Sequence, residues 1–202
     1  MSSLLPTHSA IPVYSLRKIT RTLHDSISRV ATGLKVLGGN DAASQSVANS
    51  LLAIMLYTGC NLYELMGLET SDIYLDKFQS FIIIRNNSIR QIKNVYKIRT
   101  IPLVGISRHG AQFLFNKLNE GEILFEKKKI TKVENLIKKI LIINAKTKSL
   151  SSIKLFLVSR LIKIECPEEV ILEIIGRSKK DNLYNREISL DLKKSWLEQL
   201  QF

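Results

Sequence analysis

The stretch LLAIMLYTGCNLYELMGL, residues 51–68, decides the fold because it contains two apolar helical segments on either side of one turn. The first segment ends at Thr58 and Gly59, where the helical pattern is interrupted. It continues a helix face whose apolar residues recur at steps of three and four, namely Ala43, Val47, Leu51 and Ile54. Asp41 precedes that face and is suited to cap the helix. A second, short helix is expected over residues 62–68.

Downstream of this stretch the pattern changes to strands and then returns to helices. Residues 73–75, 81–84 and 96–103 are β-rich runs separated by turn signals, which predicts a small antiparallel three-stranded sheet. Five further helices are expected, over residues 111–118, 133–143, 151–164, 167–175 and 190–200. Pro167 followed by two glutamates is typical of a helix start. The sequence therefore predicts a mostly helical α+β fold.

Composition favours a globular protein with a polyanionic partner. The chain has 202 residues, of which 45% are hydrophobic, so it is long enough to bury a core. Its 30 Lys and Arg residues exceed its 18 Asp and Glu residues, which gives a net charge of +12 and a pI near 9.7. Because no basic amphipathic helix stands alone, nucleic acid is a better candidate partner than a membrane surface.

Several other classes are not supported by the sequence. Apolar runs fall far short of the roughly 18 uncharged residues of a membrane span, and residues 1–12 lack a secretory signal, so a cytoplasmic protein without membrane contact is expected. Cys60 and Cys166 have apolar neighbours and are expected to be buried free thiols. The three histidines are too scattered for a metal site, and Gly105 and Gly110 form no phosphate loop. No metal or cofactor is predicted.

Basic residues are concentrated in and around the predicted sheet. Between residues 78 and 119 the chain has no Asp or Glu, and its seven basic residues are Arg85, Arg90, Lys93, Lys97, Arg99, Arg108 and Lys117. We expect Arg85, Arg90, Lys97 and Arg99 to contact DNA phosphates. A second basic cluster comprises Lys127, Lys128, Lys129, Lys132, Lys138 and Lys139. Charge runs of this kind also occur simply as solvated faces, and both interpretations stay open.

Three motifs stand in the order and at the spacing of one enzyme family. They are TGCNLYEL at residues 58–65, SDI at residues 71–73 and RTIPL at residues 99–103. Further on, IIGRS at residues 174–178 follows the predicted helix over 151–164 and precedes Tyr184. In these features residues 45–202 resemble the catalytic domain of tyrosine recombinases, the phage integrase and Xer-like family. The resemblance implies that family's fold and a role in DNA integration and recombination.

The resemblance also implies a set of catalytic positions. In that family a tyrosine attacks a DNA phosphodiester, two arginines stabilise the transition state, and Lys and His transfer protons. By position the corresponding residues here are Asn61, Lys93, Lys154, Arg177 and Tyr184. Tyr184 is then the nucleophile, or else an aromatic side chain that packs beside Leu183.

Most of these positions depart from the family pattern. Asn61 stands at the first arginine, and Lys154 at the second, while the third-motif histidine falls on Arg177. The hairpin lysine is Lys93, with Arg90 as the other candidate. Loss of one preorganised charge stabiliser costs about 10²–10³ in rate, so two losses predict an impaired or vestigial enzyme. Whether any strand cleavage survives is left open.

Residues 1–44 form a separate N-terminal segment in this interpretation. Its apolar residues recur at helical spacing, and they are Ile19, Leu23, Ile27, Val30 and Leu34. TGLKV at residues 32–36 and NDAA at residues 40–43 resemble the N-terminal segment of bacterial flagellin, which implies export information and a filament-type helix. A flagellin-derived structural or exported fragment is therefore the alternative function.

The favoured hypothesis is a protein that binds double-stranded DNA on a recombinase-like scaffold. In it, Glu64 is a structural hydrogen-bonding residue and the basic region of the sheet holds the DNA backbone. An active recombinase that uses Tyr184 is a second hypothesis. A helical interaction module is another, and self-association through the C-terminal helix, with Leu190, Leu197 and Leu200, belongs to it.

Overall fold

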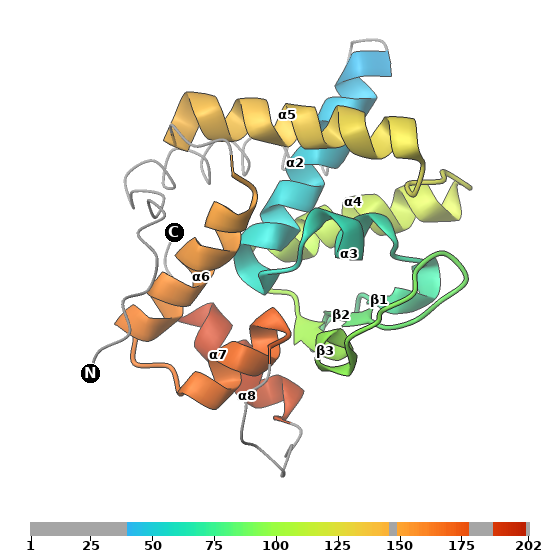
Figure 1. The fold of residues 1–202 in the computed structure, drawn as a ribbon. Helices are drawn as coiled ribbons and strands as arrows, with labels where there is room; N and C mark the ends of the chain where they lie inside the picture. The colour runs from blue at the N-terminus through green and yellow to red at the C-terminus, as the bar shows by residue number, and fades with distance from the viewer. Residues whose placement is uncertain (1–39, 146–148, 178–187, 201–202) are drawn as a thin grey trace.

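The computed structural model describes residues 40–145, 149–177 and 188–200. Two helices come first, α2 (Asn40–Thr58) and α3 (Leu62–Met66), followed by strands β1 (Ile73–Tyr74), β2 (Phe81–Ile84) and β3 (Arg99–Pro102). Five helices complete the chain: α4 (Ile106–Asn119), α5 (Lys127–Ala145), α6 (Ser151–Lys163), α7 (Glu168–Ile175) and α8 (Leu190–Glu198). Figure 1 shows α3, α4, α5 and α6 around α2, with α7 and α8 beside the sheet.

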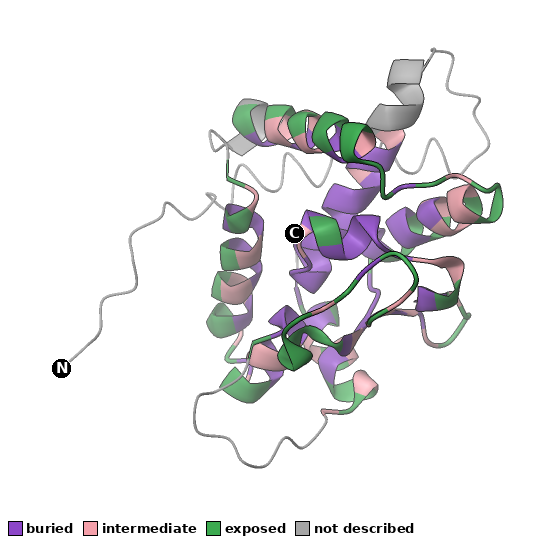
Figure 2. Cartoon of the chain, turned by 45° about the vertical axis from the view of Figure 1, so that its right-hand side comes forward, coloured by how far each residue is buried: buried purple, intermediate pink, exposed green. Residues whose placement is uncertain are grey.

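Helix α2 forms the centre of the core. From Val47 to Tyr57 its side chains are almost all buried, and it contacts α4, α5 and α6. Figure 2 shows this helix enclosed by buried segments of its neighbours. A helix that is apolar on all sides is stable only when other elements cover all of it, which explains why several helices pack around this one.

The three strands form one antiparallel sheet in the order β1-β2-β3. Ile82 pairs with Ile73 on one side and with Ile101 on the other, and these side chains are buried. Alternation places one face of each strand in the core. Helices α7 and α8 contact β3, so residues near the C-terminus cover the edge of the sheet within the same chain.

Helix α8 is attached to this edge by polar as well as apolar contacts. Lys193 is buried, and its Nζ donates to the carbonyl of Thr100 on β3 and lies 2.8 Å from a carboxylate oxygen of Glu173 on α7. Leu197 and Leu200 join the core. The predicted self-association through this helix stays a prediction, since these contacts are all internal to one chain.

The structure confirms the α+β class, the antiparallel sheet and the predicted helices after residue 40, with shifts of a few residues at their ends. One strand boundary was wrong, because residues 96–98 do not extend β3. Asn94 accepts a hydrogen bond from the backbone N–H of Tyr96, and this turn begins a 3₁₀ helix over Val95–Lys97. The predicted boundary between residues 44 and 45 falls inside α2, and the helical pattern from Ile19 to Leu34 lies outside the described residues.

Other expectations concern thiols, membranes and metals. Cys60 and Cys166 are buried free cysteines, as predicted. Among the described residues there is no helix long and apolar enough to cross a membrane. Nor does the described part of the chain bring together three or more His, Cys, Asp or Glu residues in a way that suits a metal ion.

Gly110 determines how closely α4 approaches α2. A Cβ atom at this position would lie 2.7 Å from the backbone oxygen of Ser50 and 3.3 Å from its Cα. The two helices therefore meet backbone to backbone, and only glycine fits between them. Burial of α2 on this side depends on that close approach.

We predict that Gly110→Ala lowers the free energy of unfolding by about 1–3 kcal/mol, as overpacked core substitutions do. This is opposite in sign to the gain of up to about 1 kcal/mol that the same change gives in an unrestrained helix. Urea denaturation would measure it, with Gln112→Ala on the exposed face of α4 as the control. A stabilised Gly110→Ala variant would contradict the close approach.

Candidate functional site

The candidate site begins at the turn between α2 and α3. The Asn61 side chain accepts a hydrogen bond from the N–H of Glu64 at 2.8 Å, and Glu64 in return accepts from the N–H of Asn61 at 3.0 Å. This reciprocal pair is a capping box, which satisfies two backbone donors at the start of a helix. Asn61 thus fixes the start of α3, at the position where the family resemblance places an arginine.

Glu64 also forms a buried ion pair with Arg99, the first residue of β3. The guanidinium Nη2 lies 3.1 Å from the carboxylate, and the two side chains are 1% and 7% exposed respectively. Arg99 further donates to the carbonyls of Ile174 and Lys97, at 2.9 and 2.8 Å, and to the sulfur of Cys60. One guanidinium therefore connects the α2–α3 turn, the sheet and α7.

The end of α7 reaches this guanidinium because it ends in glycine. Gly176 has a left-handed conformation, with φ of 67°, and a Cβ atom there would lie 2.7 Å from Nη1 of Arg99. Glycine adopts this conformation without steric cost. The chain therefore reverses beside Arg99, and Arg177 follows directly after the turn.

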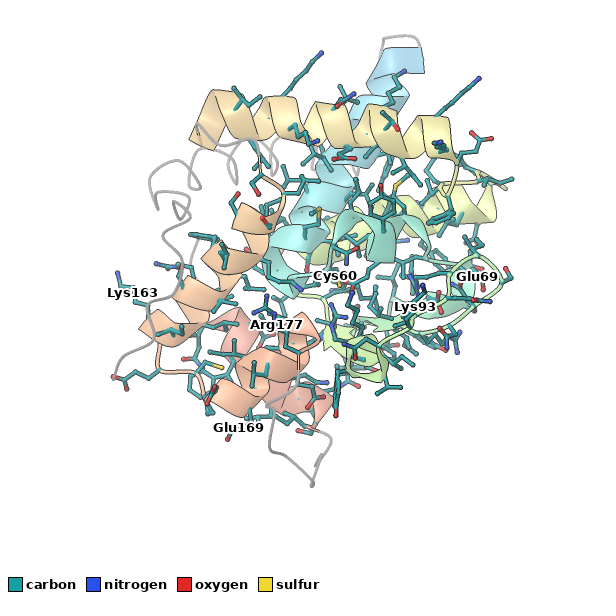
Figure 3. All side chains as sticks on the ribbon, in the orientation of Figure 1. Cys60, Glu69, Lys93, Lys163, Glu169 and Arg177 are labelled. Atoms are coloured by element: carbon teal, nitrogen blue, oxygen red, sulfur yellow. The ribbon has the colours of Figure 1, made fainter. Side chains whose placement is uncertain are left out.

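Two further cations lie around the buried pair. Lys154, in the first turn of α6, is half-buried, and its Nζ donates to the carbonyl of Ile175 at 2.9 Å. Arg177 is exposed, and its guanidinium has no partner among the described residues. Figure 3 shows Arg177 near the end of α7, in the same central region as Cys60. Lys154 and Arg177 thus add positive charge next to Arg99, whereas the nearest carboxylate, Glu64, is already paired.

Electrostatics in the cluster follow from burial and from this excess of cations. Burial lowers the pKa of Lys154, and the neighbouring Arg99 and Arg177 lower it further, while Glu64 and Cys60 act in the opposite direction. Burial opposes ionisation of Glu64, but Arg99 outweighs it and the pKa of Glu64 is lowered. Burial raises the pKa of the Cys60 thiol, which keeps it protonated and unreactive.

A second polar network supports the loop between β2 and β3. Asp72 is fully buried, accepts from Arg85 Nε at 2.7 Å and from Asn87 at 2.8 Å, and lies 3.7 Å from Arg90. Arg90 is itself buried and donates to the carbonyls of Glu64 and Arg85. These bonds attach the loop to α3, so Arg90 connects the two networks.

The predicted DNA-contact residues therefore divide into two groups. Arg90 and Arg99 are buried and fully engaged with internal partners, so they are not accessible to a phosphate. Arg85 is partly exposed but pairs with Asp72, and Lys97 is exposed. The reason is that the acidic partners, Glu64 and Asp72, come from outside the acid-free stretch of residues 78–119.

The predicted catalytic positions divide as well. Asn61, Lys154 and Arg177 lie around the Glu64–Arg99 pair, whereas Lys93 is exposed on the loop between β2 and β3, where Figure 3 shows it apart from Arg177. Tyr184 lies outside the described residues. Lys154 and Arg177 can therefore bind an anion. The amide of Asn61 and the thiol of Cys60 have structural roles instead.

The sequence interpretation missed the buried role of Arg99. Glu64 was expected to be a structural hydrogen-bonding residue, and this is confirmed. The start of α3 at residue 62 was predicted, and the pattern Asn61-x-x-Glu64 is a capping-box signature that could also have identified Asn61 as its cap. Nothing local to RTIPL indicates that its arginine is buried, because the partner lies 35 residues away.

Comparisons with known proteins leave the family open, because no family model, curated protein sequence or solved structure matches this chain.

Glu64→Gln is predicted to lower the free energy of unfolding at pH 7 by about 3–5 kcal/mol, since it leaves the buried Arg99 charge unpaired. The folded-state pKa of Glu64 is lowered, so its stabilisation is present above the ordinary value of 4.5 and is lost as the pH falls below it. The difference in free energy of unfolding between wild type and Glu64→Gln, measured by urea titration, should therefore be smaller at acidic pH than at pH 7.

Asn61→Ala serves as the comparison, because it removes one capping bond and should cost only about 1 kcal/mol at pH 7. Equal losses in the two variants, or a Glu64→Gln difference that does not vary with pH, would show that the ion pair is not the dominant interaction.

Proposed function

We propose that this protein binds duplex DNA through phosphate contacts of Lys154 and Arg177, on a scaffold related to that of tyrosine recombinases, without cleaving strands. The motif order at residues 58–65, 71–73 and 99–103 supports the relationship. The net charge of +12 supports a polyanionic partner, and phosphate contacts need cations rather than a complete catalytic set.

The observation that carries the proposal is the convergence of Lys154 and Arg177 beside a carboxylate that Arg99 already neutralises. A half-buried ammonium whose pKa is lowered by burial and by two arginines reduces stability at neutral pH. The folded state holds the ammonium proton of Lys154 less tightly than the unfolded chain does. The loss of stability therefore persists until the pH has risen through the folded-state pKa and then the unfolded-state pKa of this lysine. A phosphate placed between the two cations would remove this repulsion.

The proposal excludes efficient strand cleavage for a geometric reason. Asn61 uses its side-chain oxygen as a helix cap, and a neutral amide supplies no charge to a transition state. Arg99 is enclosed by Glu64 and by two backbone carbonyls, so it cannot take the place of the missing arginine. Lys154 provides a point charge where a planar guanidinium would bind two oxygens.

We expect Lys154→Met and Arg177→Gln each to weaken duplex binding and to reduce the slope of log K against log salt by about 0.9, the value for one lost phosphate contact. Fluorescence anisotropy with a labelled duplex at several salt concentrations would measure both. Lys163→Gln, an exposed lysine at the far end of α6, is the matched control.

Urea denaturation of the same variants separates binding from folding. Lys154→Met should unfold at the same urea concentration as wild type or higher, because replacing a poorly paired buried charge with an apolar side chain is neutral or stabilising. A stable Lys154→Met variant with unchanged DNA affinity would contradict the assigned contact. Absence of duplex binding by wild type at low salt would overturn the proposed function.

A further inference from the structure

Helix α5 carries a lysine-rich face that the proposed phosphate site does not use. Lys128, Lys132, Asn135 and Lys139 follow one another at steps of four, three and four residues and are all exposed. Residues at this spacing lie on one side of a helix. We call these four residues the α5 stripe.

The stripe keeps available charge. Lys128 and Lys139 form no ion pair with any residue in the described ranges, and the same holds for Lys127 beside the stripe. By contrast, Lys129 and Lys138 are paired with Glu122 and Glu134. Within the described residues, Lys128 and Lys139, at the two ends of the stripe, therefore keep their charge unpaired.

The stripe is held rigidly because the opposite side of α5 is part of the core. Ile130, Val133, Ile137 and Leu141 are buried, and α5 contacts α2 along this side. Lys139 lies eleven positions after Lys128, which corresponds to about 16 Å along the helix axis. That length matches roughly five steps of a duplex, whose strands rise about 3.4 Å per nucleotide.

The charge and the use of the apolar face favour a nucleic acid duplex over a membrane. A helix bound at a membrane surface inserts its apolar side between lipids. In α5 that side is already packed against α2. The exposed side carries the lysines and Asn135 of the stripe, with the exposed Ile142 three residues beyond Lys139. Exposed lysines along one face of a helix suit a phosphate backbone, which is bound mainly through its charge.

The stripe and the Lys154–Arg177 site lie on different elements. Lys154 is in the first turn of α6 and Arg177 follows α7, whereas the stripe lies on α5. Figure 1 places α5 at the top of the molecule and α7 near the bottom, with α2 and α3 between them. Figure 2 shows exposed residues along the side of α5 that faces away from the core. The stripe and the site are therefore separate groups of cations.

We propose that the α5 stripe binds a second DNA duplex, so that one protein molecule bridges two duplex segments. The bridging rests on the proposed function, because the first duplex is held at Lys154 and Arg177. The stripe contact itself does not depend on that site. The two contacts can therefore be lost separately.

A two-duplex capture assay tests this proposal with the full chain. One short duplex is immobilised, the protein is added, and retention of a second, fluorescent duplex of unrelated sequence is measured at low salt. Wild type should retain it, whereas Lys128→Gln/Lys139→Gln should reduce retention about tenfold while affinity for a single duplex changes by less than about threefold. The control is Lys77→Gln/Lys163→Gln, which removes the same charge from exposed positions outside α5.

Each outcome has a distinct meaning. Wild type that binds one duplex but retains no second duplex would overturn bridging and leave the proposed function standing. Equal loss of second-duplex retention in Lys128→Gln/Lys139→Gln and in the control double variant, or no loss in either, would overturn the assignment to α5. Retention on anionic vesicles that depends on the stripe, without bridging, would assign the stripe to a membrane and overturn the proposal. Failure to bind any duplex would reject the proposed function itself.

Discussion

The buried contact between Glu64 and Arg99 is the interaction on which the rest of the site depends. It joins the start of α3 to the start of β3, and through the carbonyl of Ile174 it also holds the end of α7. Gly176 permits that approach, and the turn it makes leads to Arg177. Lys154 reaches the same place through its bond to the carbonyl of Ile175, while α6 itself packs against α2 and α7. A charge pair with 1% and 7% exposed side chains is costly to desolvate, so its value lies in the arrangement it imposes.

Cations in this molecule fall into structural and accessible classes. Arg90 and Arg99 are enclosed and satisfied by Asp72, Glu64 and backbone carbonyls, and they stabilise the fold. Beside them Lys154 is half-buried and Arg177 is exposed, and burial together with the neighbouring arginines lowers the pKa of Lys154. The α5 stripe is a further exposed group. Burial and pairing, rather than net charge, therefore decide which cations could reach the proposed DNA partner.

Local patterns in the sequence were sufficient to predict most of the helices and strands. The contacts of the site could not be predicted in this way, because they join residues that are far apart in the sequence. Helix periodicity located α2 and α4 to α8, and the β-rich runs located the sheet, because both follow from short-range spacing. Residues 96–98 were misassigned because the side chain of Asn94 redirects the backbone, an effect that strand propensity ignores. The acid-free stretch of residues 78–119 suggested that four of its cations contact DNA phosphates. Three of its arginines, Arg85, Arg90 and Arg99, instead lie against Asp72 or Glu64, which precede the stretch, and no local pattern reveals such pairing.

The most direct test of the account is to map amide chemical-shift changes by NMR while a short duplex is added at low salt. The account predicts that the first residues to respond are those around the buried pair, at Asn61 to Glu64, Lys154 and Arg177, and that these changes diminish together as salt is raised. Changes confined to other surfaces, such as the start of α7 at Glu168 and Glu169, with the residues around Glu64 and Arg99 unaffected, would contradict it.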